Sequence, residues 1–354
     1  MKFIHISDVY LGIQPETNAD WAGKRAKEIE DTFIQVLQAC NERDVDLLLI
    51  AGNLFAKSPE VADFEWLDEK LQTLTKTRTI IVPGHADYLE ADSEAASYHF
   101  RSRTVLLPAG RTTNAYLRGI NTCVTGFGYA KPEYKGRILE GIEPGRAGAI
   151  NILIGSAGDK NHMPFDKEVV ARKAFDYVAL GHYHRPIHIL KNRIAYSGSP
   201  EPVLHTDQGR HGYIFGEITD DGTNISFTPI AKRSYVTIEV TLRTDITAET
   251  VKENLEEQLM KMGQDNIYTI VFRGFAQNEY LPDLTRIKNR FDVYDVVDLT
   301  ITKADEELLL AENQNNIMGR FIKEMHDSVN IDEKIRNKAL RYGMEALIMA
   351  GDKK

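Results

Sequence analysis

His182 and His184 stand two residues apart, directly after the apolar run at residues 177–180, and histidines placed in this way can bind a metal. The apolar run predicts a buried strand. Side chains that follow such a strand can turn into a pocket beyond the sheet edge and offer neutral imidazole nitrogens to an ion. A Gly-His-x-His turn can also be only the polar end of a strand. A metal site here would need further ligands from elsewhere in the chain.

Four more apolar segments end in small or polar residues. They are residues 2–7 before Asp8, 46–51 before Asn53, 79–82 before His85, and 150–154 before Ser156. Amphipathic helices are expected at residues 22–40 and 64–74, which predicts β-α-β units and a parallel sheet. Ligand sites in open α/β sheets lie beyond the carboxyl ends of the strands. The pattern therefore predicts one site to which all five segments contribute.

The order and spacing of these segments resemble the calcineurin-like metallophosphoesterases, and more narrowly the SbcD-type nuclease subunits of bacterial DNA double-strand-break repair. Five motifs carry the resemblance, at residues 6–12, 51–55, 83–87, 180–184 and 196–201, and it extends over residues 1–215. It implies an α/β (α+β) fold in which a two-sheet sandwich is flanked by helices. It also implies a metal-dependent nuclease activity and an ATPase partner.

The motifs depart from the family pattern at most of the ligand positions. That pattern reads Asp-x-His, Gly-Asp, Gly-Asn-His-Asp, a further His, and Gly-His-x-His. Asp8, His182, His184 and Asp87 match it. The replaced positions are Tyr10, Asn53, His85, Ala86 and Ser156.

By this resemblance, one metal would be bound by Asp8, Tyr10, Asn53 and His184, and the other by Asn53, His85, Ser156 and His182. Ala86 stands where the family has the histidine that acts on the leaving group, and a methyl group can neither donate a proton nor stabilise charge.

Charge argues against a pair of ions. Two divalent ions about 3.5–4 Å apart repel each other by about 16 kcal/mol at an effective dielectric of 20, and a bridging carboxylate normally offsets this. Asn53 is neutral, so Asp8 is the single matched anionic ligand. We expect at most one manganese, zinc or iron ion, surrounded by Asp8, Asn53, His85, His182 and His184, or none.

His162 lies six residues after Ser156, in a loop that would border the site. We expect it to be a surface residue, and the alternative is that it replaces a missing ligand. The two cysteines, Cys40 and Cys123, are far apart and indicate neither a disulfide framework nor a thiolate metal site.

Composition is that of an ordinary globular protein, with 42% hydrophobic and 27% charged residues. The sequence has no apolar stretch of membrane-spanning length and no leader pattern, so we expect a cytoplasmic protein without membrane contact. The net charge of −9 favours at most weak, salt-dependent DNA binding.

Three segments are predicted: a phosphoesterase domain at residues 1–233, a small α/β cap at 234–302 and a helical tail at 303–354. The cap contains seven basic and twelve acidic residues, and its helix at 247–262 is expected to begin with a Thr247 and Thr250 capping pair. We expect two helices in the tail, with apolar stripes at Ile317, Phe321 and Met325 and at Ile331, Ile335, Ala339 and Tyr342. Such stripes usually pack on their own domain, but in the resembled family the equivalent region binds the coiled coil of an ATPase.

Two functions remain open. The first is a catalytically inactive member of the nuclease-subunit family that serves as a scaffold for an ATPase, for DNA ends or for a homodimer. The second is a phosphodiesterase or DNA exonuclease that works through a reduced, one-metal site.

Overall fold

The computed structural model describes residues 1–14, 21–242, 246–275, 282–301, 303–328 and 330–351. The chain divides into two compact units, Met1–Tyr235 and Val236–Lys354, which are described separately below. The division into three segments stays a prediction, and residue 302, where the predicted cap ends, lies outside the described residues. No helix that the structure describes is long and apolar enough to cross a membrane.

The first unit contains two six-stranded mixed sheets. One sheet has the order β12-β11-β1-β2-β3-β4, in which β1 to β4 pair in parallel and β11 pairs antiparallel with both β1 and β12. Its strands are β1 (Lys2–Ile6), β2 (Leu47–Ala51), β3 (Arg78–Val82), β4 (Thr104–Leu106), β11 (Gly212–Thr219) and β12 (Gly222–Pro229). The predicted parallel β-α-β arrangement is therefore present in this sheet.

The second sheet has the order β5-β6-β7-β8-β10-β9, with four parallel central strands and antiparallel strands at both edges. Its strands are β5 (Thr112–Leu117), β6 (Thr122–Phe127), β7 (Ile150–Ser156), β8 (Tyr177–Gly181), β9 (Ile187–Leu190) and β10 (Ile194–Tyr196). The sequence of residues 187–196 predicts a single strand, and this prediction is wrong because two strands, β9 and β10, form there. The chain reverses there through Asn192, whose φ of 59° is typical of a turn.

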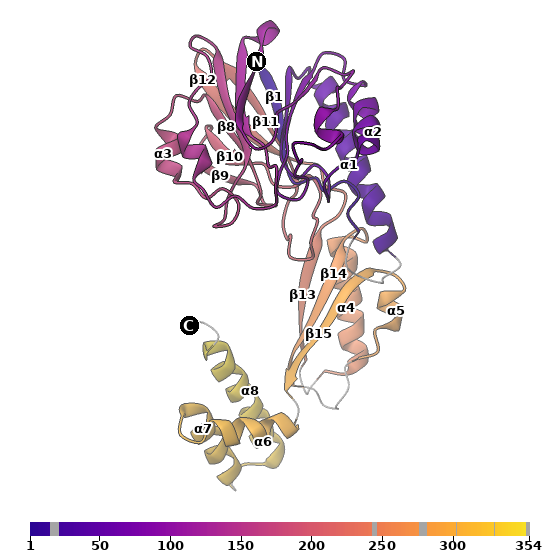
Figure 1. The fold of residues 1–354 in the computed structure, drawn as a ribbon. Coiled ribbons are helices and arrows are strands. Elements are labelled where there is room, and N and C mark those ends of the chain that lie inside the picture. Colours follow the sequence, from indigo (N-terminus) through magenta and orange to yellow (C-terminus); the bar gives the residue numbers. More distant parts are fainter. Residues whose placement is uncertain (15–20, 243–245, 276–281, 302, 329, 352–354) are drawn as a thin grey trace. The chain divides into compact units, whose positions relative to one another are not determined.

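Helices cover the outer faces of the two sheets, so that the unit has four layers (Figure 1). Helices α1 (Ala22–Glu42) and α2 (Val61–Leu71) pack on the first sheet, and α3 (Lys167–Ala171) packs on the second. Alternate residues of β2 face opposite ways: Leu48 and Ile50 contact the helices, and Leu47 and Leu49 contact the other sheet. Both faces of the central strands are thus buried, which explains their continuous apolar sequences.

The second unit contains a three-stranded sheet in the order β13-β14-β15, with β14 and β15 parallel. Its elements are β13 (Tyr235–Leu242), α4 (Ala248–Met262), β14 (Ile267–Phe275), α5 (Thr285–Lys288) and β15 (Asp292–Ile301). Leu255 and Leu259 of α4 are buried with Tyr268 and Phe272 of β14. The Thr247 hydroxyl accepts the backbone N–H of Thr250 at 3.2 Å and lies 3.0 Å from the Thr250 hydroxyl. Thr247 is therefore the N-cap, which is the first half of the predicted capping pair.

The tail of this unit contains three helices rather than the two that were expected. They are α6 (Lys303–Glu312), α7 (Ile317–Asp327) and α8 (Glu333–Gly351). Their small core consists of Met318, Ile322, Leu340 and Met344, and Phe321 and Met325 pack against it. Ile317, Ile331, Ile335 and Tyr342 are exposed, so the predicted stripes divide into a buried part and an exposed part.

Candidate metal centre at the sheet edges

In the first unit, strands of both sheets have their carboxyl ends at one common edge. The predicted site residues come directly after these strands in the sequence. Asp8 follows β1, Asn53 follows β2, His85 follows β3 and His182 follows β8. The His182 backbone N–H donates to Asp8 Oδ2 at 2.9 Å, which joins the two sheets. Gly181 permits this approach, because a Cβ added there would lie 2.0 Å from the Ala51 carbonyl oxygen.

Asn53 is completely buried at the centre of this edge. Its Nδ2 donates to Asp8 Oδ1 at 2.7 Å and to His85 Nδ1 at 3.2 Å, and its Oδ1 accepts the Ala86 N–H at 3.0 Å. The amide orientation is fixed from both sides, because Asp8 requires a donor and Ala86 requires an acceptor. Both oxygens of Asp8 are therefore occupied by N–H groups.

Asp87, the family-matching residue of the third motif, is buried and has a structural role. Its carboxylate accepts backbone N–H groups of Asn53, Leu54, Phe55 and Gly84 at 2.6–3.3 Å. Burial raises the pKa of Asp87 to about 6, against the opposing effect of these hydrogen bonds. The carboxylate joins the loop after β2 to the loop after β3, and this places Asn53 beside His85.

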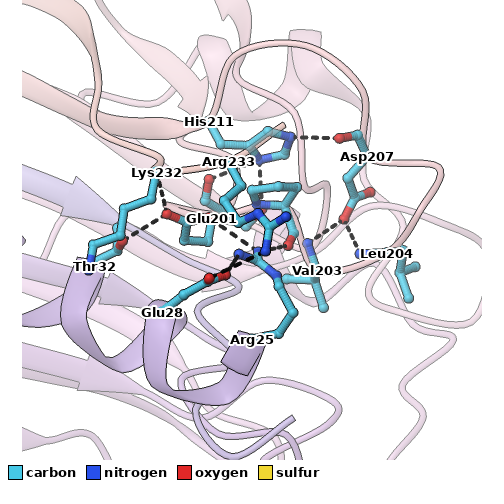
Figure 2. Close-up of polar contacts among 12 residues, drawn as sticks. Arg25, Glu28, Thr32, Glu201, Val203, Leu204, Asp207, His211, Lys232 and Arg233 are labelled. Carbon is cyan, nitrogen blue, oxygen red and sulfur yellow. Dashed lines mark hydrogen bonds and ion pairs between the residues drawn. The ribbon is translucent and has the colours of Figure 1, made fainter. Parts of the chain in front are cut away.

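His184 is held by a carboxylate that the sequence reading did not identify. Its Nδ1 donates to Asp207 Oδ2 at 2.8 Å. The same oxygen accepts the backbone N–H groups of Val203 and Leu204, as Figure 2 shows. The pKa of His184 is raised, because the hydrogen bond to Asp207 and the nearby Asp8 outweigh the effect of burial. The Tyr10 ring lies edge-on to His184 at 5.3 Å, and burial beside three carboxylates raises the pKa of the Tyr10 hydroxyl.

The loop that carries Asp207 is fixed to α1 by a buried ion pair, also drawn in Figure 2. Glu201 accepts hydrogen bonds from Arg25 at 3.2 Å and from Thr32 at 2.8 Å, and Arg25 and Glu201 are each 1% exposed. Glu201 ends the fifth family-like motif. Its contacts show that it holds the loop in place and does not reach the strand ends.

His162 is not a free surface side chain, contrary to the expectation. Its ring centroid lies 4.4 Å from that of His85 and 4.9 Å from that of His182. Asp159 contacts two of these three rings: its carboxylate lies 2.9 Å from His162 Nδ1 and 3.1 Å from His182 Nε2. Three imidazoles and one carboxylate thus gather next to Asn53.

Ser156 and His182 each have a buried polar atom without a hydrogen-bond partner among the described residues. These atoms are Ser156 Oγ and His182 Nδ1. Asp8, Tyr10, Asn53 and His182 also have positive φ angles of 54°, 54°, 52° and 113°, which non-glycine residues rarely adopt. Such backbone strain is typical of functional sites.

The comparisons with known proteins agree with this architecture. The sequence model of the calcineurin-like phosphoesterase family matches residues 1–186. The chain belongs to this family. It is also similar to the DNA double-strand break repair protein Mre11 of Methanopyrus kandleri, with 25% identity over 238 residues, 60% of this chain and 52% of the relative. The chain thus spans about half the length of that relative.

Calcineurin-like phosphoesterases use divalent metal ions, and the side chains present here do not fit a pair of them. Asn53 directs two N–H bonds at Asp8 and His85, where a bridging carboxylate would direct two oxygens at two cations. Turning the amide over would place its NH₂ group against the Ala86 N–H and its oxygen against Asp8. The donor set for one ion is present instead in Asp159, His162 and His182, whose ligand atoms all lie within 4.8 Å of one another.

Asp8, Asn53, His85 and His182, which the sequence analysis grouped, lie together in the structure, and Asp159 and Asp207 were not identified from the sequence. Asp159 left a signal, because an Asp three residues before a His can fold back onto it in a tight turn, as it does here. Asp207 left none. It lies 23 residues after His184, in a loop whose path depends on Arg25 and Glu201.

Proposed function

We propose that this chain is a phosphoesterase-family protein related to DNA repair nucleases that has lost two-metal phosphodiester hydrolysis and acts through binding. The observation that carries the proposal is the Asn53 amide, which donates to Asp8 and accepts from Ala86. This amide forms hydrogen bonds with the polar groups at the edge of the sheets, where the family uses cations and a carboxylate.

The energetic cost of restoring a metal there supports the proposal. An ion at Asp8 would have to displace the Asn53 donor, and turning the amide to offer its oxygen would leave the Ala86 N–H facing a donor. Each buried group left unsatisfied costs about 1–3 kcal/mol. The Asn53 oxygen gained as a metal ligand would therefore be offset by the loss of two hydrogen bonds, one to Asp8 and one from Ala86.

Proton transfer to a leaving group is also missing. Ala86 has no titratable atom, and its neighbour His85 is not a substitute. Burial, together with the nearby His182 and His162, lowers the pKa of His85 to about 4, so its ring is neutral at physiological pH. The His85 Nδ1 accepts a hydrogen bond from Asn53 and has no proton to give.

The remaining role that we propose is that of an interaction subunit in DNA repair. The relative named above is a DNA double-strand break repair protein. In the second unit, Ile317 and Ile335 are 72% and 62% exposed on α7 and α8, and we propose this surface as the docking site for the coiled coil of an ATPase partner. The acidic balance of residues 234–302 keeps DNA binding weak in this proposal.

A one-metal phosphodiesterase is the second candidate function. The observation that favours it is the Asp159, His162 and His182 cluster, which can hold an ion next to Asp8. The two candidates differ in whether DNA is cleaved.

A nuclease assay separates them. The purified chain, supplied with manganese, is incubated with linear duplex and single-stranded DNA, and Asp8→Ala is the matched control. We expect the wild type and the control to give the same background. The variant with Tyr10→His, Asn53→Asp, His85→Asn, Ala86→His and Ser156→His restores the family pattern and is expected to cleave. Cleavage by the wild type that disappears in Asp8→Ala would contradict the proposed function.

A further inference from the structure

Asp159, His162 and His182 form a compact set of ligand atoms, two of whose members lie outside the five family-like motifs. The Asp159 carboxylate lies 2.9 and 3.0 Å from His162 Nδ1 and 3.1 Å from His182 Nε2. Ligands of a tetrahedral ion with bonds of about 2.0–2.1 Å are about 3.3 Å apart. Side-chain shifts of a few tenths of an ångström would bring the carboxylate and either imidazole to that spacing.

The loop that carries Asp159 and His162 is built by its own hydrogen bonds. Asp159 Oδ1 accepts the backbone N–H groups of Asn161 and His162 at 2.8 and 3.1 Å. The loop is also joined to the segment between β6 and β7: the Tyr134 N–H donates to the Asn161 carbonyl at 2.9 Å, and the Met163 N–H donates to the Tyr134 carbonyl. Two of the three ligands are therefore held in place before any ion binds.

Exposure suits an ion as well. The side chains of His182 and His162 are 9% and 19% exposed and that of Asp159 is 45% exposed, which leaves one side of the cluster open to solvent.

His85 is excluded as a further ligand. Its ring lies 4.4 Å from that of His162, but its Nδ1 accepts from Asn53, which leaves the proton of the neutral ring on Nε2. Asp8 is not part of the set either, because among the described residues only Asp159, His162 and His182 have ligand atoms that all lie within 4.8 Å of one another.

We propose that Asp159, His162 and His182 bind a single divalent transition ion of the zinc type, with an open fourth position. Two imidazoles, one carboxylate and an open position form a ligand set that zinc accepts. This site is shifted away from the Asp8 and His184 positions of the family pattern and uses the loop after β7. It does not depend on the proposed function, because it concerns which atoms bind an ion and not whether DNA is cleaved.

The test uses the full-length chain, stripped with chelator and then titrated with zinc or cobalt alone. We expect one ion per chain, a visible ligand-field absorption from bound cobalt, and a higher thermal unfolding temperature with zinc. His162→Gln and Asp159→Asn should weaken binding by more than about 100-fold, beyond the usual effect of losing an outer-shell partner. Their unfolding temperatures without metal show whether they fold.

Two matched variants make the result specific. His188→Gln replaces an exposed histidine of β9, and Asp220→Asn replaces an exposed aspartate in the turn between β11 and β12. Both should bind zinc as the wild type does. The proposal is overturned if the wild type binds no zinc or if folded His162→Gln binds it unchanged. Cleavage of DNA that requires Asp8 would instead contradict the proposed function and leave this site standing.

Discussion

Asn53 is the residue on which the chemistry of the sheet edge depends. A carboxylate at this position would give the site an anion between two cations, whereas the amide gives it two donors and one acceptor. The amide satisfies Asp8, His85 and Ala86 together. At this position the amide thus supplies hydrogen bonds and no negative charge.

Asn53→Asp should destabilise the metal-free protein. It replaces the donor that lies 2.7 Å from Asp8 by a second buried carboxylate, and an unpaired buried charge costs about 3–5 kcal/mol. Urea denaturation in the presence of chelator measures the loss, and manganese should recover part of it. Asn224→Asp on the exposed face of β12 is the control, with an expected change within about 0.5 kcal/mol. Equal stability of Asn53→Asp and the wild type in chelator would show that the hydrogen-bond network contributes little.

His5 gives the first unit a defined sensitivity to acid. It is fully buried, its Nδ1 shares a hydrogen bond of 2.9 Å with the Tyr177 hydroxyl, and burial lowers its pKa from 6.5 to about 3. Below pH 6.5 the unfolded chain takes up a proton that the folded chain refuses, so the free energy of unfolding falls as the pH falls toward 3, by up to about 1.4 kcal/mol per pH unit.

His5→Gln removes this titration and keeps an acceptor for Tyr177. Urea denaturation at pH 7, 6 and 5 should show a shallower decline for the variant than for the wild type. The same slope in both proteins would mean that His5 is protonated in the folded state.

The types of the site residues were predictable from the sequence, whereas their partners were not. Asp8, Asn53, His85 and His182 follow strand ends that a parallel sheet must bring together. The direction of the Asn53 amide depends on the Ala86 backbone N–H, and the inward turn of His162 depends on Asp159 and Tyr134. These contacts arise from loop conformation, for which periodicity carries no signal.

At the scale of the elements, the contact between the two sheets is what brings the strand ends within hydrogen-bonding distance. Gly181, at the end of β8, lies against β2 and the residue after β1: an added Cβ would be 2.0 Å from the Ala51 carbonyl oxygen and 2.7 Å from Ser7 Cβ. The hydrogen bond between the Ser7 and Ser197 hydroxyls, at 2.9 Å, joins the sheets at the same level.

Gly181→Ala should therefore destabilise the protein by at least about 1–3 kcal/mol, because the added methyl group forces the sheets apart. Gly23→Ala, in α1, is the matched control: nothing lies within 4 Å of the added Cβ, and the substitution should be neutral or stabilise the helix by about 0.5–1 kcal/mol. Thermal and urea denaturation give both values. A Gly181→Ala variant as stable as the wild type would show that the sheets separate without cost.

Elements with buried, continuous apolar sequences were predictable, and short or exposed elements were less so. The five strands that end at the site and helices α1, α2 and α4 lie where the apolar pattern puts them. The turn between β9 and β10 was missed because residues 187–190 are largely exposed and give no alternation. The tail was read as two helices because the break between α6 and α7 carries no proline or glycine.

At the scale of the whole molecule, the chain has the fold of its family, and our proposal is that the ligand pattern of its site is mostly replaced. The backbone angles at Asp8, Tyr10, Asn53 and His182 are strained, as is typical of functional sites.

The stoichiometry of manganese at saturation tests this account most directly. The full-length wild type, freed of metal with chelator, is equilibrated with excess manganese, and bound metal per chain is measured by elemental analysis after removal of free ions. The five-substitution variant that restores the family pattern serves as the comparison and is expected to bind two ions. The account predicts no more than one manganese ion per wild-type chain, because Asn53 supplies no bridging charge, and two ions per wild-type chain would contradict it.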